Sequence, residues 1–207
     1  MKKMFGIISF IMAVAIIVAF IPSERTQKTL AAETKNERQL INPQDAMAYL
    51  HEKGIIEGYE DGQLKPENYL TRAEFAAMVC RAYGYKTGGQ SGFSDMIGHW
   101  ADGYVKACTD AGAIDGVGDN KFSPDNCVLM EHASKILTVC GGFTDGEGVI
   151  YPNGYIKTAN DNKLYLNSSF YPSDSESIFE RLIEVRGTEL SRIDAAVMFY
   201  NAAGGKF

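Results

Sequence analysis

The sequence predicts a mainly α-helical domain built from three helix–loop–helix repeats. The first observation behind this prediction is a recurrence: setting Gly54 on Gly112, an offset of 112 − 54 = 58, brings further turn residues into register. The superposed pairs are Gly58 and Gly116, Asp61 and Asp119, Leu64 and Phe122, Pro66 and Pro124, and Gly84 and Gly142. Setting Thr71 on Ser191, an offset of 191 − 71 = 120, adds a third copy.

The second observation is an apolar stripe in the second predicted helix of each repeat. Apolar residues recur at i, i+3, i+4 and i+7, which is the spacing of one helix face. The stripes are Phe75, Met78, Val79 and Ala82, then Ala133, Ile136, Leu137 and Cys140, then Ala195, Met198, Phe199 and Ala202. Three matching stripes at fixed offsets predict helices that bury these faces together.

In the first repeat, both helices carry start or stop signals. Asn42 suits the cap of the first helix, Pro43 its first position, and Gly54 the left-handed residue that ends it. Thr71 and, three residues later, Glu74 form a capping-box pattern at the start of the second helix. The Glu-Asp-Gly-Gln run between the helices is typical of a turn.

The second repeat has a regular first helix and an irregular second one. An apolar stripe that begins at Trp100 and stops before Gly112 predicts the first helix, with the Trp100 ring mostly in the core. The start of the second helix has Leu129, Met130 and His132 in place of Thr71, Arg72 and Glu74. Both the cap and the charge are missing there, so we expect this helix to begin earlier, at Asp125 or Asn126.

The third repeat departs furthest from the first. Its first helix is predicted over Tyr155–Leu166, with Lys163 in place of the stop glycine. An insertion follows, in which residues 177–186 are compatible with a short helix or with an edge hairpin. Ser191 can then cap the second helix, with Arg192 at its first position.

The N-terminus is typical of an export signal. Two lysines precede an apolar run over residues 5–21, and Ala31 offers a cleavage site. The run is also long enough to cross a bilayer, so an uncleaved anchor is the alternative. We expect residues 1–31 to be a signal peptide, residues 32–41 a polar leader, and the rest of the chain to lie outside the cytoplasm.

The formal charge argues against nucleic acid as a partner. The chain has 20 Lys and Arg against 26 Asp and Glu, a net charge of −6. Residues 1–31 hold four bases and one acid, so the remainder has a net charge of 16 − 25 = −9. An acidic protein is a poor general binder of polyanions, and individual arginines would have to hold any acidic ligand.

Several motifs carry a resemblance to a known family. They are Gly-Ile-Ile-x-Gly-Tyr-x-Asp-Gly-x-Leu-x-Pro at 54–66, Leu-Thr-Arg-Ala-Glu-Phe at 70–75, Phe-Ser-Asp at 93–95 before His-Trp-Ala at 99–101, and a degenerate Leu-Ser-Arg-Ile-Asp at 190–194. In these motifs the sequence resembles the S-layer homology domain family, most strongly in the first repeat and least in the third.

The resemblance implies an architecture and a role. It implies three repeats, at 42–86, 92–142 and 143–207, packed as one pseudo-threefold domain. It also implies that an exported protein is held non-covalently on the bacterial cell wall, often through a pyruvylated secondary wall polysaccharide. Another surface protein is a second conceivable partner.

Arg72 is the first candidate ligand-binding residue. It is predicted at the first position of a helix, where unpaired backbone N–H groups and the helix dipole favour anions. A guanidinium there can hold a carboxylate, such as that of a pyruvyl ketal, with two hydrogen bonds. A solvated surface charge or a pair with a neighbouring acid is the alternative. Arg192 occupies the matching position in the third repeat, so we expect at most two competent sites.

Three more residues complete the candidate ligand-binding set. Thr71 and Ser191 cap the two helices that begin with these arginines. The resemblance implies that an aromatic residue lies near the ligand groove at the place of Trp100, where one ring edge can stack on a sugar.

Four cysteines in an exported chain raise the question of disulfides. Cys108 and Cys140 fall on the inward stripes of the two helices of the second repeat, so a bridge between them is considered. Cys80 lies off its stripe and Cys127 lies in a loop. Buried reduced cysteines are the alternative. The sequence lacks a Cys-x-x-Cys motif, and we expect neither a metal nor a cofactor.

The sequence lacks a recognisable catalytic constellation. The three histidines are far apart, and no Gly-x-Ser-x-Gly motif, phosphate loop or EF-hand loop is present. We therefore expect a non-enzymatic surface protein that binds acidic wall polysaccharide. One alternative is a repeat module that has lost sugar binding and contacts protein. The other is a secreted hydrolase of wall glycan, for which carboxylates are plentiful but no pair stands out.

Overall fold

The computed structural model describes residues 41–171 and 178–205. These residues belong to one compact unit of the chain, Leu40–Phe207. The predicted signal peptide at 1–31, and all but the last residue of the predicted leader at 32–41, lie outside the described residues. In the described ranges no helix is both long and apolar enough to cross a membrane.

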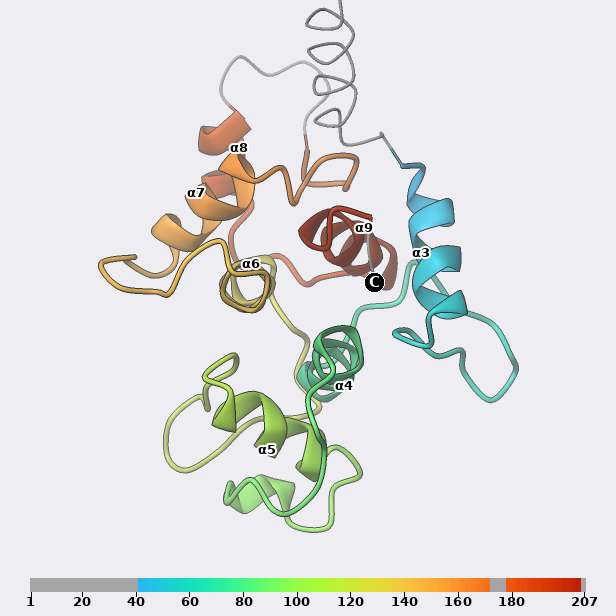
Figure 1. The fold of residues 1–207 in the computed structure, drawn as a ribbon, viewed down its shortest axis with the longest axis vertical. Coiled ribbons are helices and arrows are strands. Elements are labelled where there is room, and N and C mark those ends of the chain that lie inside the picture. Colours follow the sequence, from blue (N-terminus) through green and yellow to red (C-terminus); the bar gives the residue numbers. More distant parts are fainter. Residues whose placement is uncertain (1–40, 172–177, 206–207) are drawn as a thin grey trace, which may run out of the picture. The chain divides into compact units, whose positions relative to one another are not determined.

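The described chain is mainly helical, which confirms the predicted fold class. The elements are α3 (Pro43–Glu52), α4 (Arg72–Tyr83), the 3-10 turn η1 (Ser94–Met96), α5 (Asp102–Asp110), α6 (Met130–Cys140), α7 (Asn153–Asp161), α8 (Ile178–Glu184) and α9 (Arg192–Ala202). Within residues 41–171 and 178–205 the extended backbone forms isolated bridges and no strand. Figure 1 shows α4, α6 and α9 grouped centrally, with α3, α5 and α7 outside them.

Each outer helix packs mainly against the second helix of the preceding repeat, and α7 also contacts α8, the helix that follows it. α5 packs on α4, and α7 packs on α6. The circle closes where α3 packs on α9, so the first and last described helices are neighbours (Figure 1). At this closure the rings of Tyr49 and Tyr200 meet edge to face, with centroids 5.4 Å apart. The repeats are therefore interlocked.

A ring of three backbone hydrogen bonds joins the repeats at their centre. The N–H of Leu70 donates to the carbonyl of Leu190 at 3.0 Å, that of Leu190 to Val128 at 2.9 Å, and that of Val128 to Leu70 at 2.9 Å. All three residues are buried, and each lies two positions before the first residue of a central helix. These hydrogen bonds place the starts of α4, α6 and α9 equivalently around one axis.

The central helices are buried well beyond the predicted stripes. In α4 every residue from Phe75 to Cys80 is buried, and in α9 every residue from Asp194 to Phe199 is buried. The rings of Phe75 and Phe199 pack at 5.2 Å between centroids. Because each central helix has an outer helix and other central helices around it, little of its surface remains for solvent.

The helix caps of the first repeat are those predicted. The Asn42 side chain accepts a hydrogen bond from the N–H of Gln44 at 2.9 Å. Thr71 and Glu74 exchange hydrogen bonds in a complete capping box, at 3.1 Å and 2.9 Å. These bonds satisfy N–H groups that a helix start leaves without intrahelical partners.

The predicted start of the second helix in the second repeat is wrong. α6 begins at Met130, with Leu129 at its cap, and not at Asp125 or Asn126. Leu129 is extended because it pairs with Glu189, directly after the central ring. The tertiary ring therefore fixes where this helix can begin, even without a capping side chain.

Two further expectations concerned the helices of the third repeat. Its first helix, α7, spans Asn153–Asp161, so the predicted Tyr155–Leu166 is shifted toward the C-terminus. Lys163 adopts φ 61°, the left-handed conformation that Gly54 and Gly112 adopt in the other repeats, each at φ 67°. In the insertion, residues 178–184 form the short helix α8, not the hairpin.

The disulfide considered between Cys108 and Cys140 is not present. All four cysteines are free thiols. Cys108 lies on α5, which packs on α4 of the first repeat, so its sulfur faces Cys80 instead, at 3.3 Å. The prediction failed because it paired helices of the same repeat.

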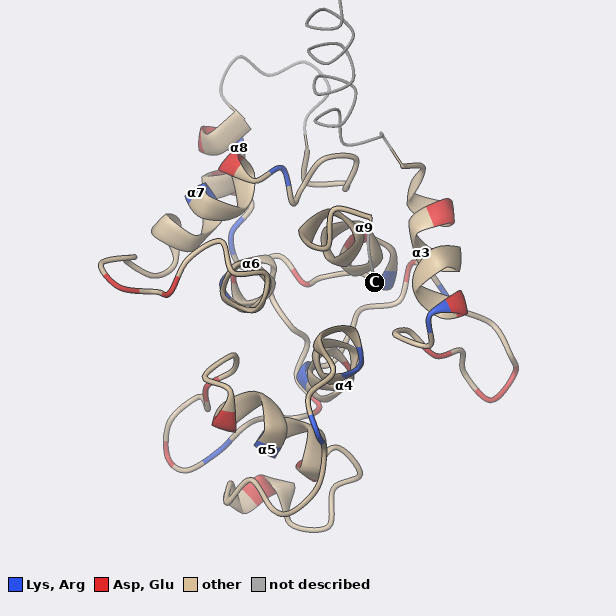
Figure 2. Cartoon of the chain, viewed as in Figure 1, with Lys and Arg blue, Asp and Glu red and all other residues tan. Residues whose placement is uncertain are grey.

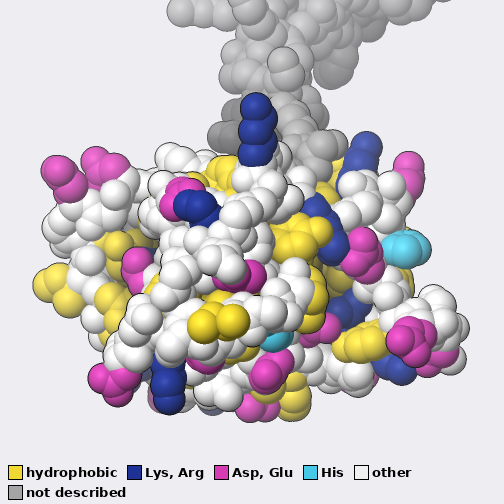
Figure 3. All heavy atoms as spheres, turned by 90° about the horizontal axis from the view of Figure 1, so that it is seen from below, with side chains coloured by type: hydrophobic (Ala, Val, Ile, Leu, Met, Phe, Trp, Pro, Cys, Tyr) yellow, Lys and Arg dark blue, Asp and Glu magenta, His cyan; other side chains and the backbone are white. Residues whose placement is uncertain are grey.

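Charges are distributed over the outer parts of this unit. Figure 2 shows acidic residues on the loops that follow α3 and α6. On the face seen in Figure 3, acidic and basic side chains are interspersed among hydrophobic ones. Binding of an acidic ligand must therefore depend on a local arrangement of cations.

Candidate functional site

Arg72 crosses a repeat boundary. Its Nε donates to the carbonyl of Phe122 at 2.9 Å, and its Nη2 donates to the carbonyl of Asp115 at 3.0 Å. The guanidinium also lies over the Phe122 ring, 4.5 Å from its centroid. The side chain is only 8% exposed and forms no ion pair with any described residue. The structure therefore contradicts both alternatives considered for Arg72, a solvated surface charge and a pair with a neighbouring acid.

The remaining guanidinium nitrogen of Arg72 is available to a ligand. Nη1 has no hydrogen-bond partner among the described residues. Burial lowers the pKa of Arg72, while the nearby Tyr151, Asp95 and Asp115 act in the opposite direction. Because a guanidinium remains protonated at neutral pH in proteins, this side chain is a fixed, buried positive charge.

A cleft of about 360 Å³ opens beside this charge. The Arg72 cleft, as we name it, is lined by Arg72, residues 113–117, His132, Lys135, Ile136 and Tyr151. Lys135 pairs with the carboxylate of Asp115 at its edge. The rings of His132 and Tyr151 are stacked, with an interplanar angle of 19° and centroids 6.4 Å apart. The cleft thus combines cations with an aromatic wall.

His132 is neutral at neutral pH in this setting. Burial lowers its pKa below 6.5, the adjacent Arg72 and Lys135 lower it further, and Glu131 opposes them. Its Nδ1 accepts a hydrogen bond from the N–H of Leu129 at 3.4 Å. His132 therefore replaces half of the capping box that Glu74 forms in the first repeat.

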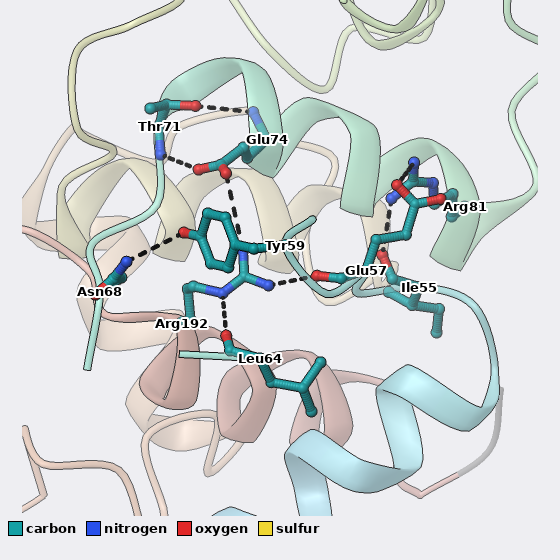
Figure 4. Close-up of polar contacts among 9 residues, drawn as sticks. All are labelled: Ile55, Glu57, Tyr59, Leu64, Asn68, Thr71, Glu74, Arg81 and Arg192. Carbon is teal, nitrogen blue, oxygen red and sulfur yellow. Dashed lines mark hydrogen bonds and ion pairs between the residues drawn. The ribbon is translucent and has the colours of Figure 1, made fainter. Parts of the chain in front are cut away.

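Arg192 repeats this geometry at another boundary. Its Nε donates to the carbonyl of Leu64 at 2.7 Å, its Nη2 to that of Glu57 at 2.5 Å, and its guanidinium lies over Tyr59. Figure 4 shows these contacts, together with the Glu74 carboxylate that approaches Nη1 at 3.8 Å. Unlike Arg72, Arg192 therefore has an acidic partner.

A smaller cleft, of about 140 Å³, lies beside Arg192. The Arg192 cleft is lined by Arg192, residues 56–59, Leu70, Glu74, Ala77, Met78, Arg81 and Trp100. The prediction that Trp100 is mostly in the core is wrong, because it is 58% exposed. Trp100 precedes α5, which begins at Asp102, so the period of that helix does not set its direction.

The two clefts are built from equivalent parts. The offset of 58 that relates the repeats maps residues 56–59 onto 114–117, and Glu74 and Ala77 onto His132 and Lys135. Tyr155 aligns with Tyr104 at 155 − 104 = 51, and the same offset maps Trp100 onto Tyr151. Each cleft therefore takes an arginine from one repeat, a loop and a helix from the next, and an aromatic residue that precedes an outer helix.

Sequence reasoning missed the partners of each arginine. Tyr151 could have been found by extending the Tyr155 alignment four residues toward the N-terminus. Lys135 and His132 were passed over because the second repeat seemed to have lost its site. That repeat lacks an arginine of its own, yet its α6 supplies Lys135 and the neutral ring of His132 to the cleft of the first repeat's arginine.

The charges of the two clefts differ. The Arg72 cleft is lined by Arg72 and Lys135 against Asp115 alone, which gives +2 − 1 = +1 with His132 neutral. The Arg192 cleft is lined by Arg81 and Arg192 against Glu57 and Glu74, which gives +2 − 2 = 0. Arg81 also pairs with Glu57 at 2.7 Å. The Arg72 cleft is therefore better suited to an anion.

Comparison with known proteins identifies the repeats. The sequence model of one family, described as S-layer homology domain, matches residues 42–76 and 92–128. Both segments are therefore similar to S-layer homology domains. They contain both loops that receive an arginine, 56–66 and 114–124, and the start of α4 with Arg72 itself.

Surface proteins and an enzyme carry similar sequence. The chain is 26% identical over 185 residues to Cell surface glycoprotein 1 of Acetivibrio thermocellus, covering 76% of this chain and 8% of that protein. It is 35% identical over 107 residues to S-layer protein sap of Bacillus anthracis, covering 47% and 13%. It is 38% identical over 89 residues to Endo-1,4-beta-xylanase A of Thermoanaerobacterium saccharolyticum, covering 42% and 8%. The chain thus spans only a small part of each of these proteins.

The S-layer homology loop of the second repeat is anchored by Asp95. Its carboxylate accepts hydrogen bonds from the N–H of Phe122 at 2.9 Å and of Ser123 at 2.8 Å. Burial raises the pKa of Asp95, but these bonds outweigh it and the pKa is lowered overall. Because the carbonyl of Phe122 receives Arg72, Asp95 indirectly positions the arginine.

Thr71 and Ser191 serve as caps. Thr71 caps α4, and the Ser191 hydroxyl accepts from the N–H of Asp194 at 3.1 Å and donates to the Asp194 carboxylate at 2.6 Å. Neither residue lines the Arg72 or the Arg192 cleft. Their contribution to those clefts is to fix the helix starts from which the arginines extend.

A third cleft has a different character. This Asp194 cleft has a volume of about 470 Å³ and is lined by Pro43, Gln44, Glu67, Tyr69, residues 167–170, Thr188, Glu189, Ser191, Ile193 and Asp194. The described residues around it include no basic side chain. Met130 stands at the arginine position of the second repeat and is fully buried. Without a basic side chain among its described lining residues, the third cleft is less suited to an anion than the Arg72 cleft.

Proposed function

We propose that these S-layer homology repeats attach a cell-surface protein to the bacterial cell wall by binding an acidic wall polysaccharide. The proposed contact is a carboxylate of the polymer, such as a pyruvyl ketal, in the Arg72 cleft. The role is non-enzymatic: similarity to the xylanase extends over only 8% of that enzyme, which fits a module shared by catalytic and non-catalytic surface proteins.

The state of Arg72 carries this proposal. Its guanidinium is held in place by two backbone carbonyls, while Nη1 has no described partner and a cleft lies beside it. A buried cation without an acidic partner pays a desolvation cost that an incoming carboxylate can offset. Because Phe122 and Asp115 already fix the side chain, little conformational entropy is lost when the anion binds.

The rest of the cleft suits a sugar that carries the anion. The exposed ring of Tyr151 gives an apolar face on which a pyranose can stack. Lys135 adds a second cation at the rim, although Asp115 partly neutralises it. The proposed pose directs the carboxylate toward Arg72 and lays the sugar ring against Tyr151.

We assign the Arg192 cleft a secondary role. Glu74 approaches Arg192 and Glu57 pairs with Arg81, so an incoming carboxylate would meet two acids. Trp100 is exposed there and can stack on an uncharged sugar of the same polymer. On this proposal Arg192 mainly joins repeats, and its ligand contact is weaker than that of Arg72.

Sedimentation with purified wall sacculi tests the proposal. The chain should pellet with untreated sacculi and remain in the supernatant after mild acid has removed the ketals. Because Arg72 also supports the fold, the variant of choice is Tyr151→Ala. Trp100→Ala is the matched aromatic comparison, which should lose less retention because its contact is the weaker one, and circular dichroism checks folding.

Two results would count against the proposal. Equal retention on ketal-free sacculi would remove the carboxylate from the account. Equal retention of the parent and the Tyr151 variant would remove the Arg72 cleft. Failure to bind protein-free wall material would favour the alternative in which the module contacts protein. Release of reducing sugars from sacculi would favour the hydrolase alternative.

A further inference from the structure

Two cysteines from different repeats face each other in the interface between α4 and α5. Cys80 and Cys108 are 2% and 0% exposed, and their sulfurs lie 3.3 Å apart. Each thiol also approaches a carbonyl one turn earlier on the opposite helix: Cys80 that of Tyr104 at 3.3 Å, and Cys108 that of Ala76 at 3.5 Å. The two side chains are therefore aimed at each other across a packed interface.

The two thiols of the pair differ in pKa. A hydrogen bond from the Cys108 thiol lowers the pKa of Cys80, and the same bond, together with burial, raises the pKa of Cys108. Cys80 is therefore the thiol that ionises first, and Cys108 is the one that keeps its proton. This difference in acidity exists only in the packed interface, where both thiols are buried.

We propose that Cys80 and Cys108 form a disulfide that joins the first repeat to the second. The inference rests on the proposed surface location, because disulfides persist in oxidising compartments outside the cytoplasm. The sulfurs need to approach by little more than 1 Å to reach bonding distance, about 2.05 Å.

The oxidant is a disulfide of a small thiol or of a thiol–disulfide oxidoreductase, acting before α5 has packed on α4. The Cys80 thiolate attacks one sulfur of that disulfide, forms a mixed disulfide and releases one thiol. Cys108 then loses its proton and attacks the Cys80 sulfur of the mixed disulfide, which releases the second thiol. Two protein thiols are oxidised and one external disulfide is reduced, so atoms and electrons balance.

The other two cysteines are less suited to this bond. Cys140, at the end of α6, accepts a hydrogen bond from the Tyr85 hydroxyl at 3.6 Å. Cys127 lies in the extended segment that pairs with Thr71, beside Glu189, and burial raises its pKa. In the described structure only Cys80 and Cys108 have sulfurs in contact.

The bond would constrain the repeat boundary at which the Arg72 cleft lies. α4 carries Arg72 at its first residue and Cys80 near its end, while α5 leads into the loop that receives Arg72. Closing the 28-residue separation between the cysteines lowers the entropy of the unfolded chain. The cleft itself is already complete without the bond, so binding to sacculi does not require it.

Peptide mapping of the purified full chain tests the inference directly. The chain is folded with oxidised glutathione, its remaining thiols are alkylated, and it is digested with trypsin without reduction. The four cysteines fall on separate tryptic peptides, 73–81, 107–121, 122–135 and 136–157. The expected result is a link between 73–81 and 107–121, with Cys127 and Cys140 alkylated. Four alkylated cysteines, or any other link, would overturn the proposal.

Thermal unfolding gives a second readout. The oxidised chain should melt about 5–10 °C above the same chain in reductant. Cys80→Ser combined with Cys108→Ser should abolish that difference, whereas Cys127→Ser combined with Cys140→Ser should keep it. Equal melting of the oxidised and reduced parent would also refute the bond. Loss of sacculus binding with an intact 80–108 link would defeat the proposed function and leave this inference standing.

Discussion

The Nε of Arg192 donates to the carbonyl of Leu64, 128 residues earlier in the chain, at 2.7 Å. The corresponding atom of Arg72 donates to Phe122, the counterpart of Leu64 at the offset of 58. The arginine that marks the start of the second helix is thus a connector between repeats. Arg192 forms an ion pair with Glu74, whereas Arg72 forms no ion pair with any described residue.

Replacing Arg192 by methionine, the residue at the same position in the second repeat, should destabilise the fold. The carbonyls of Leu64 and Glu57 would lose their donor, and Glu74 would lose a cation, at a cost of about 2–4 kcal/mol. Urea unfolding measures this loss. The control is Arg181→Met, since Arg181 is exposed, and a similar loss in both variants would contradict the connector role.

Asp95 should support the Arg72 cleft from a distance. Asp95→Ala removes the acceptor for the N–H groups of Phe122 and Ser123, so we expect a lower melting temperature and several-fold weaker binding to sacculi. Because the pKa of Asp95 is lowered on folding, its contribution is present above the unfolded pKa of about 3.9 and is lost as pH falls through the folded value. Unchanged binding in Asp95→Ala would show that the loop holds its place without this carboxylate.

Gly116 leaves no space for a side chain. A Cβ there would lie 2.6 Å from Cε1 of Phe93 and 2.8 Å from the carbonyl oxygen of Lys121, whereas at the equivalent Gly58 the nearest atom is 3.3 Å away. Gly116→Ala should therefore cost about 1–3 kcal/mol, and Gly58→Ala should cost clearly less. Parallel denaturant titrations compare the two, and equal losses would contradict the steric argument.

Binding of the acidic polymer should strengthen as pH falls through the folded pKa of His132, which lies below 6.5. The folded pKa of His132 is lowered, so protonation adds a charge to the Arg72 cleft only as pH falls through that value, while a ketal carboxylate remains ionised. Relative to pH 7.5, we expect a gain of a few-fold once pH is below the folded pKa of His132, and no such gain in His132→Gln. The same shift weakens the fold, since the unfolded chain binds the proton from about pH 6.5 downward. An equal gain in the variant would exclude His132 as its source.

The sequence predicted local features well because short-range chemistry sets them. The Asn42 cap and the capping box of Thr71 and Glu74 follow from neighbouring residues. The start of α6 and the partner of Cys108 could not be predicted in this way. Both depend on which repeats pack together. An apolar stripe indicates that a helix face is buried, but it does not indicate which element covers that face.

In the candidate site, too, local features were predictable and packing partners were not. Arg72 and Arg192 were predicted from their helix positions as ligand-binding residues, and their burial was not foreseen, because each side chain extends into the neighbouring repeat. Lys135 and Tyr151 carry no motif and become part of a site only through the interlocked packing.

Calorimetric titration with a soluble pyruvylated wall fragment tests the central claim most directly. The account predicts one carboxylate-dependent site per chain, at least ten-fold weaker in Tyr151→Ala and nearly unchanged in Trp100→Ala. Two equivalent sites, or a stronger loss from the Trp100 substitution, would contradict the assignment of the anion to the Arg72 cleft.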